Sequence, residues 1–267
     1  CRNHASIDTY AKKLFIKKKY EMLKKLKVTL SVFFVFTQCL NNYDKRYDTF
    51  FASILNRNSF TLPKNIKIIS WNYDFQIERA YAEYTDDYRV DSTDSSLNIQ
   101  SKFSGHNFVE DGFCICKING TANIVQPSFS SSFQYTEALN STLDIKSIES
   151  ALRNYAFLLF SNQSDCLPAL SFAWENDNTT ENNIITKTKA ITKETNILIV
   201  VGYSFPFFNR HIDREIIGGM NNLEKIYLQA PDAKNLVERF ESVRPDIDIK
   251  KLIPRFDVEQ FLLPNEL

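Results

Sequence analysis

The sequence is poor in glycine, histidine and methionine, and it carries no net charge. Of its 267 residues, six are glycine, three are histidine and two are methionine, while Lys plus Arg and Asp plus Glu both total 32. A chain without net charge has no overall basic field that would hold a polyanion, so we expect no nucleic-acid partner. Because glycine is scarce, a glycine directly after a strand is informative: it lets the backbone come close to a ligand.

The sequence given also lacks long apolar runs, a signal-peptide pattern and metal-binding cysteine spacings. The longest apolar run, residues 28–40, has 13 residues, whereas a membrane-spanning helix needs about 20. No signal-peptide pattern precedes it, so we expect a cytoplasmic protein without a membrane partner. The chain starts with a cysteine rather than a methionine, and we expect an upstream part of the gene product to be missing.

The cysteines show no C-x-x-C spacing, which favours buried free thiols over a metal site or disulfides. The five cysteines are Cys1, Cys39, Cys114, Cys116 and Cys166.

Residues 1–60 predict an N-terminal helical segment that packs on the core. Apolar residues recur at helical spacing through residues 11–30, and a second helical stretch is predicted for residues 28–55. Lysines fill most of the other face of the first helix. We interpret that face as solvated, with an acidic partner or lipid head groups as the alternative. The lysines are Lys12, Lys13, Lys17, Lys18, Lys19, Lys24, Lys25 and Lys27.

Residues 61–267 predict a Rossmann-like α/β domain, a mostly parallel sheet flanked by helices, so that the chain forms one compact domain overall. We expect four adjacent central strands at residues 66–70, 113–117, 197–201 and 226–228. The spacing of apolar residues predicts helices at 75–81, 145–160, 186–193, 209–217 and 232–243. The polar residues 86–104 predict a loop or flap, and residues 169–174 predict a helix fragment.

Three of these strands end in distinctive polar groups. The groups are Asn72-Tyr73-Asp74, Asn119-Gly120-Thr121 and Gly202-Tyr203-Ser204. Taken singly, each group has a plain explanation as a turn or a helix cap. Ligands of open parallel sheets bind beyond the carboxyl ends of the strands, so the conjunction favours a binding site. We therefore expect Asn72, Asn119, Gly202 and Ser204 to converge on one cleft.

The segments IISWNYDFQIERA, CKINGTANI and ILIVVGYSFPFFNRHID resemble three ordered landmarks of sirtuin-like domains, in particular the prokaryotic sirtuin-like NAD hydrolases of antiphage defence. The resemblance covers residues 66–231, and its last segment is the most specific. It implies a bacterial protein that uses NAD as substrate or ligand without a metal ion. The implied catalytic residues are Asn72, Asn119 and Asp74, and the implied NAD-binding residues are Asn72, Asp74, Gly120, Gly202, Tyr203 and Ser204.

The resemblance also implies a role for each group. Asn72 would orient the nicotinamide ribose or a water molecule, Asp74 would lie close to the nicotinamide, and Gly202 and Ser204 would meet the ribose and the phosphates. Cleavage of the nicotinamide glycosidic bond builds up an oxocarbenium-like ribose, which a fixed carboxamide stabilises by positioning and electrostatics.

The sequence departs from the family pattern at two places. Asn119 stands where the family has its catalytic histidine, and an amide takes no proton near neutral pH. His106 is the first candidate to replace that base, while we expect His4 and His211 to be exposed or capping residues. The family's Gly-Ala-Gly-x-Ser phosphate loop and the four-cysteine zinc module of deacylating sirtuins have no counterpart here.

Three functions remain open at this point. The first is an NAD glycohydrolase-type effector, and the second is a catalytically impaired module that senses NAD or an ADP-ribose derivative. The third is an interaction domain in which the strand-end residues are turns and caps. An NAD-type dinucleotide is the expected ligand, and a protein partner or a homo-oligomer is left open.

Overall fold

The computed structural model describes residues 6–85, 93–104, 108–126, 131–133, 145–160, 167–175 and 183–266. The chain divides into two compact units. Unit 1 comprises residues 1–44, 69–108 and 115–172, and unit 2 comprises residues 45–68, 109–114 and 173–267.

Unit 1 begins with two helices where the sequence predicts one. Helix α1 (Ile7–Ile16) starts at Ser6, whose hydroxyl accepts a hydrogen bond from the Thr9 amide, and helix α2 spans Tyr20–Leu40. Lys18 separates them with a φ of 55°, a left-handed conformation that ends a helix. The predicted continuous helix over residues 11–30 is therefore wrong. The second predicted stretch also divides, because α3 (Lys45–Ile54) is separate from α2 and belongs to unit 2.

The first sheet has the strand order β1-β3-β2. Strands β1 (Lys67–Ser70) and β3 (Cys114–Lys117) match their predictions, and α4 (Gln76–Ala82) follows β1 as expected. The predicted loop at residues 86–104 is wrong for residues 93–100, which contain α5 (Thr93–Ser96) and β2 (Ile99–Gln100), a strand that pairs parallel with β3; residues 101–104 are neither helix nor strand, as expected. Residues 86–92 of that loop lie outside the described residues.

Cysteine burial agrees with the sequence analysis at three positions. Cys39, Cys114 and Cys116 are buried free thiols, while Cys1 and Cys166 lie outside the described residues.

The second sheet is antiparallel and was not predicted. Its order is β5-β4-β6, with β4 at Gly120–Gln126, β5 at Ser131–Phe133 and β6 at Leu167–Leu170. The helix fragment predicted for residues 169–174 is wrong, because a short apolar run does not distinguish a strand from a helix; only η4 (Ala173–Glu175) is helical there. Helices α2 and α6 (Ile145–Phe160) contribute to the core with β4, and the Tyr155 hydroxyl donates to the Ala122 carbonyl over 2.7 Å.

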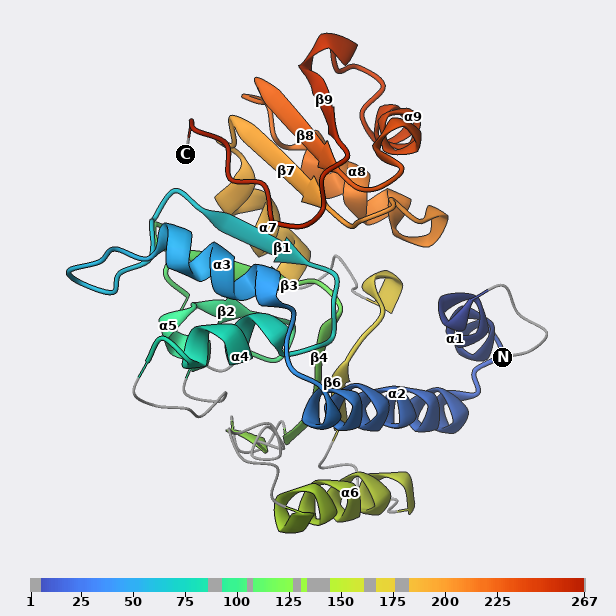
Figure 1. Ribbon diagram of the computed structural model, residues 1–267. Coiled ribbons are helices and arrows are strands. Elements are labelled where there is room, and N and C mark those ends of the chain that lie inside the picture. The colour runs from blue at the N-terminus through green and yellow to red at the C-terminus, as the bar shows by residue number, and fades with distance from the viewer. Residues whose placement is uncertain are drawn as a thin grey trace. The chain divides into compact units, whose positions relative to one another are not determined.

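Unit 2 holds a parallel sheet of order β7-β8-β9, formed by Ile197–Val201, Lys225–Gln229 and Leu252–Arg255. Figure 1 shows these strands side by side in orange to red, and α9 lies next to them. Helices α7 (Ile184–Thr192), α8 (Arg210–Gly218) and α9 (Ala233–Val243) match the predicted helices. Two short turns of 3-10 helix, η5 (Phe207–Asn209) and η6 (Ile249–Lys251), complete the unit.

The predicted fold class is confirmed at the level of a mixed α/β protein with parallel sheets flanked by helices. The expected adjacency of the four strands is wrong, because β1 and β3 share one sheet while β7 and β8 share another. Apolar runs identify strands, but they do not say which strands pair. Among the described helices, none combines the length and apolar character needed to cross a membrane.

Candidate functional site

The seven predicted site residues divide between the two units. Asn72, Asp74, Asn119 and Gly120 belong to unit 1, and Gly202, Tyr203 and Ser204 belong to unit 2. Unit 1 brings its two groups together, as the hydrogen bonds below show, whereas the convergence of Asn72 and Asn119 with Gly202 and Ser204 stays a prediction. His211 is exposed on α8 as expected, and His4 and His106 lie outside the described residues.

The strand-end segment of unit 1, residues 71–75, is held against residues 117–122. Main-chain and side-chain donors of residues 117–122 donate hydrogen bonds to four carbonyls within residues 70–74. These bonds fix the path of the chain after β1. The four bonds are Ile118 N to Ser70 O at 2.9 Å, Asn119 Nδ2 to Trp71 O at 2.9 Å, Ala122 N to Tyr73 O at 2.8 Å and Lys117 Nζ to Asp74 O at 2.6 Å.

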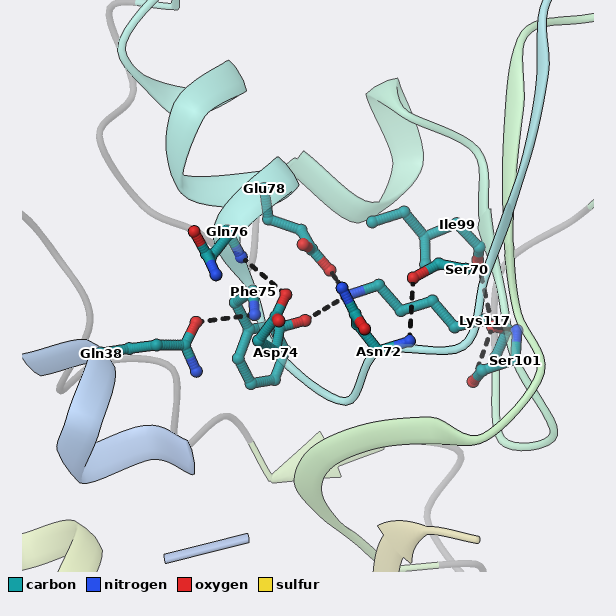
Figure 2. A network of polar contacts seen from close by, with 11 residues as sticks. Gln38, Ser70, Asn72, Asp74, Phe75, Gln76, Glu78, Ile99, Ser101 and Lys117 are labelled. Atoms are coloured by element: carbon teal, nitrogen blue, oxygen red, sulfur yellow. Dashed lines mark hydrogen bonds and ion pairs between the residues drawn. The ribbon is translucent and has the colours of Figure 1, made fainter. Parts of the chain in front are cut away.

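Asn72 and Asp74 have different surroundings within this segment (Figure 2). The Asn72 backbone donates to Ser70 Oγ over 3.2 Å, and its side chain is exposed. The half-buried Asp74 accepts at Oδ1 from the Gln76 amide over 3.3 Å, a turn that leads into α4. Asn72 therefore offers a carboxamide to solvent or a ligand, while Asp74 takes part in the local turn.

A buried ion pair between Lys117 and Glu78 lies next to the segment, as Figure 2 shows. The two side chains are 2% and 1% exposed, and Lys117 Nζ also lies 5.1 Å from the centroid of the Phe75 ring. Burial raises the pKa of the Glu78 carboxyl, and the neighbouring Lys117 charge partly opposes that shift. Because both groups are buried, the pair supports the segment rather than meeting a substrate.

The sequence analysis missed this pair although one signal was present. Lys117 is a single charge between the apolar residues Cys116 and Ile118. A lysine in an otherwise buried strand needs a partner, because an unpaired buried charge is costly. The partner, Glu78, is similarly the one acidic residue of the apolar stretch of α4.

Helix α2 also holds the segment in place. Gln38 Oε1 accepts from the Phe75 amide over 2.7 Å, as Figure 2 shows. Arg79 of α4 donates in turn to the carbonyls of Gln38 and Asn41, over 2.7 Å and 3.0 Å, and so satisfies the end of α2. The N-terminal helices are therefore part of the scaffold of this strand end.

Asn119 and Gly120 have roles that the fold alone explains. Asn119 is buried, its Nδ2 is bonded to Trp71 O, and its Oδ1 has no hydrogen-bond partner among the described residues. Gly120 has a φ of 70°, and a Cβ there would lie 2.0 Å from the Ala169 carbonyl oxygen. Only glycine satisfies both the conformation and the close approach of β6.

The strand-end segment of unit 2, residues 202–205, is built differently. Gly202 has a φ of 61°, its amide donates to Gln229 O over 3.2 Å, and a Cβ there would meet no described atom within 4 Å. Ser204 is exposed, and its carbonyl accepts from Arg239 Nη1 over 3.1 Å. The left-handed conformation thus favours glycine at 202, and the space in front of it stays open.

Aromatic packing fixes the remainder of this segment. Phe205 is buried with a φ of 50°, and its ring meets those of Tyr203 and Phe240 edge-on, at centroid distances of 5.0 Å and 5.6 Å. A bulky residue in the left-handed region is strained, and this packing stabilises it.

Tyr203 binds a buried carboxyl instead of being free for a ligand. Its hydroxyl donates to the two oxygens of Asp213, at 3.0 Å and 3.1 Å, and Asp213 is 2% exposed. Burial raises the pKa of Asp213 to about 7, against the lowering effects of the Tyr203 hydrogen bond and the Arg210 charge. The sequence analysis missed Asp213, whose signal was an acidic residue next to Ile212 on the apolar stripe of α8.

Within the described residues, no cluster of three or more His, Cys, Asp or Glu could hold a metal ion. No protein-family model matches the chain, and no curated protein or solved structure matches it. The resemblance to sirtuin-like domains therefore rests on the three sequence segments alone.

Proposed function

We propose that the chain is a sirtuin-like, Rossmann-type domain that binds NAD and acts as an NAD glycohydrolase-type effector of bacterial antiphage defence. The observation that carries the proposal is the exposed Asn72 carboxamide at the end of β1, on a segment that residues 117–122 hold in place. A side chain on such a fixed segment orients a reactant at little entropic cost.

The reaction breaks the bond between the nicotinamide nitrogen and C1′ of the ribose. A water molecule adds at C1′, nicotinamide leaves with the bonding electron pair, and the products are ADP-ribose, nicotinamide and a proton. Asn72 orients the ribose hydroxyls or the water, and Asp74 favours the positive charge that develops on the sugar. In unit 2, the exposed Ser204 offers a hydroxyl for a ribose or phosphate oxygen, and Gly202 leaves space for a ligand to approach.

A second candidate is an NAD-binding sensor with little turnover, and the bonding of Asn119 favours it. Asn119 gives its Nδ2 hydrogen to the Trp71 carbonyl, and its amide accepts no proton from a water near neutral pH. A general base commonly contributes about 10²- to 10⁴-fold to the rate. If no other residue supplies that proton transfer, NAD binding is retained while cleavage is slow.

The test measures NAD binding and NAD consumption on the full-length gene product. At 100 times its dissociation constant, NAD should stabilise the folded state by about 2.7 kcal/mol. Asn72→Ala should remove turnover while leaving the melting temperature without ligand unchanged, because this side chain is exposed. Asn235→Ala, an exposed position on α9, is the matched control and should leave both measurements unchanged.

Asn119→His separates the two candidates. In a sensor, the added imidazole should raise turnover with little change in NAD binding, because it acts mainly in the transition state. Rapid NAD cleavage by the wild type that Asn119→His does not raise would exclude the sensor. A chain that neither consumes NAD nor is stabilised by it would exclude both candidates.

A further inference from the structure

The turn between α1 and α2 and the helix ends that flank it carry exposed basic and exposed apolar side chains. We call residues 12–27 the basic-apolar turn. Four of its apolar side chains are exposed, and two of them, Phe15 and Met22, belong to the apolar stripe that helical spacing predicts. The four are Phe15 at 39%, Ile16 at 68%, Tyr20 at 57% and Met22 at 44%.

The break at Lys18 causes this exposure. Its left-handed φ of 55° ends α1 at Ile16, and the amides of Lys18 and Lys19 donate to Phe15 O and Leu14 O at the end of that helix. A new helix starts at Tyr20, so the apolar stripe does not continue across the break. Ring contact still orders the surface, because Phe15 and Tyr20 pack edge-on with centroids 6.2 Å apart.

Positive charge is concentrated in the same residues. The basic-apolar turn contains eight lysines and one acidic residue, Glu21, which gives it a net charge of +7. The whole chain has 32 basic and 32 acidic side chains, so all other residues together carry −7. Lys17, Lys18 and Lys19 lie at the break itself, and all three are exposed. The turn is therefore a local basic patch on a neutral chain.

We propose that the basic-apolar turn docks on a membrane surface rich in anionic lipid. Lysine side chains place their charges among the head groups and their methylene stems along the apolar layer. Exposed Phe, Ile, Tyr and Met side chains enter the boundary between head groups and acyl chains, where aromatic rings are favoured.

The small size of the exposed apolar part favours lipid over an acidic protein as the partner. A stable protein interface buries about 800 Å² on each side and needs a complementary shape, whereas the exposed apolar part of this turn consists of four side chains. A fluid lipid surface needs no matching pocket. It also accepts the apolar groups and the lysines at once.

The experiment is co-sedimentation of the chain with vesicles of phosphatidylcholine alone or with one third phosphatidylserine. We expect binding to the anionic vesicles only, weakened in 0.5 M salt because the charges are screened. Each lysine near such a surface contributes about fivefold to partitioning, so Lys17→Glu, Lys18→Glu and Lys19→Glu combined should lower it by about 100-fold or more. Ile16→Ser with Tyr20→Ser should lower it by about tenfold.

A matched triple variant controls for net charge. Lys193→Glu, Lys234→Glu and Lys250→Glu change three exposed lysines outside the turn by the same formal charge, and partitioning should stay within about twofold if the turn is the docking surface. Circular dichroism confirms that each variant is folded. Equal losses in both triple variants, no preference for phosphatidylserine, or self-association that Ile16→Ser with Tyr20→Ser abolishes would each overturn the proposal.

Discussion

The strand-end segments of the two units are held in place by different kinds of interaction. In unit 1, residues 71–75 are held by main-chain bonds and by a lysine whose charge is neutralised by a buried glutamate. In unit 2, residues 202–205 are held by two left-handed residues, an aromatic stack and a tyrosine bonded to a buried carboxyl. The first depends on paired charges and the second on conformation and packing.

The difference sets how each segment responds to change. A buried ion pair is costly to break from one side, because the remaining charge is left without a partner. A buried carboxyl whose partner is a neutral hydroxyl can instead take up a proton, so its state depends on pH. Unit 1 should therefore be sensitive to substitution at the pair, and unit 2 should be sensitive to pH.

The largest effect is expected at the ion pair of unit 1. Lys117→Met should lower the free energy of unfolding by about 3–5 kcal/mol, because Glu78 stays buried without its partner. Urea unfolding measures the change. Lys117→Met combined with Glu78→Met should recover most of the loss, since both buried charges are then gone.

Unit 2 provides the matched control for this substitution. Lys189→Met breaks the Lys189–Glu215 pair, whose side chains are 41% and 19% exposed, and should cost about 1 kcal/mol or less. If Lys117→Met costs no more than Lys189→Met, the ion pair does not hold the segment and the contrast between the units fails.

An intermediate effect is expected when the two strand-end glycines are compared. Gly120→Ala places a Cβ against the Ala169 carbonyl in a left-handed conformation, and it should cost about 3 kcal/mol. Gly202→Ala meets open space and carries only the conformational penalty, about 1 kcal/mol. Thermal unfolding of the two variants checks the order, and equal costs would contradict the described packing of Gly120.

The smallest effect is expected in the pH dependence of unit 2. The pKa of Asp213 is raised from 3.8 to about 7 in the folded state, so the folded state binds this proton more tightly than the unfolded state does. Its stabilising contribution is complete below pH 3.8 and is lost as pH rises through about 7. Relative to Asp213→Asn, the wild type should lose roughly 2–3 kcal/mol of unfolding free energy between pH 5 and pH 8.

Tyr203→Phe sharpens this comparison. The Tyr203 hydroxyl lowers the pKa of Asp213, so its removal should move the stability loss to higher pH. Chemical denaturation at a series of pH values measures the shift. A wild type and an Asp213→Asn variant with parallel pH profiles would show that Asp213 does not titrate between pH 5 and pH 8.

Local sequence patterns predicted the elements of unit 2 better than those of unit 1. Strands β7 and β8 and helices α7, α8 and α9 lie within two residues of their predicted bounds, because each contains an uninterrupted apolar pattern. Strand β9 was missed, since Leu252–Arg255 is short and contains a proline. In unit 1, β4 and β6 were missed because the antiparallel sheet joins segments that are far apart in the sequence.

The sequence also located the strand ends without revealing what holds them. Asn72, Asp74, Asn119 and Gly120 were selected as ligand contacts, yet the structure gives Asn119 a bond to Trp71 and Gly120 a close contact with Ala169. Such roles depend on neighbours about 50 residues away, which no local pattern contains.

The sequence by itself determined the α/β class, most helices, the burial of the three described cysteines and the positions at which strands give way to polar residues. These features follow from apolar periodicity and turn chemistry, which act over a few neighbouring residues. Only the tertiary structure decided that Lys117 pairs with Glu78, that Tyr203 binds Asp213, and that the first helix breaks at Lys18. Pairing of buried charges and exposure of an apolar stripe depend on which distant segments pack together, because burial is a property of the folded chain rather than of any residue within it.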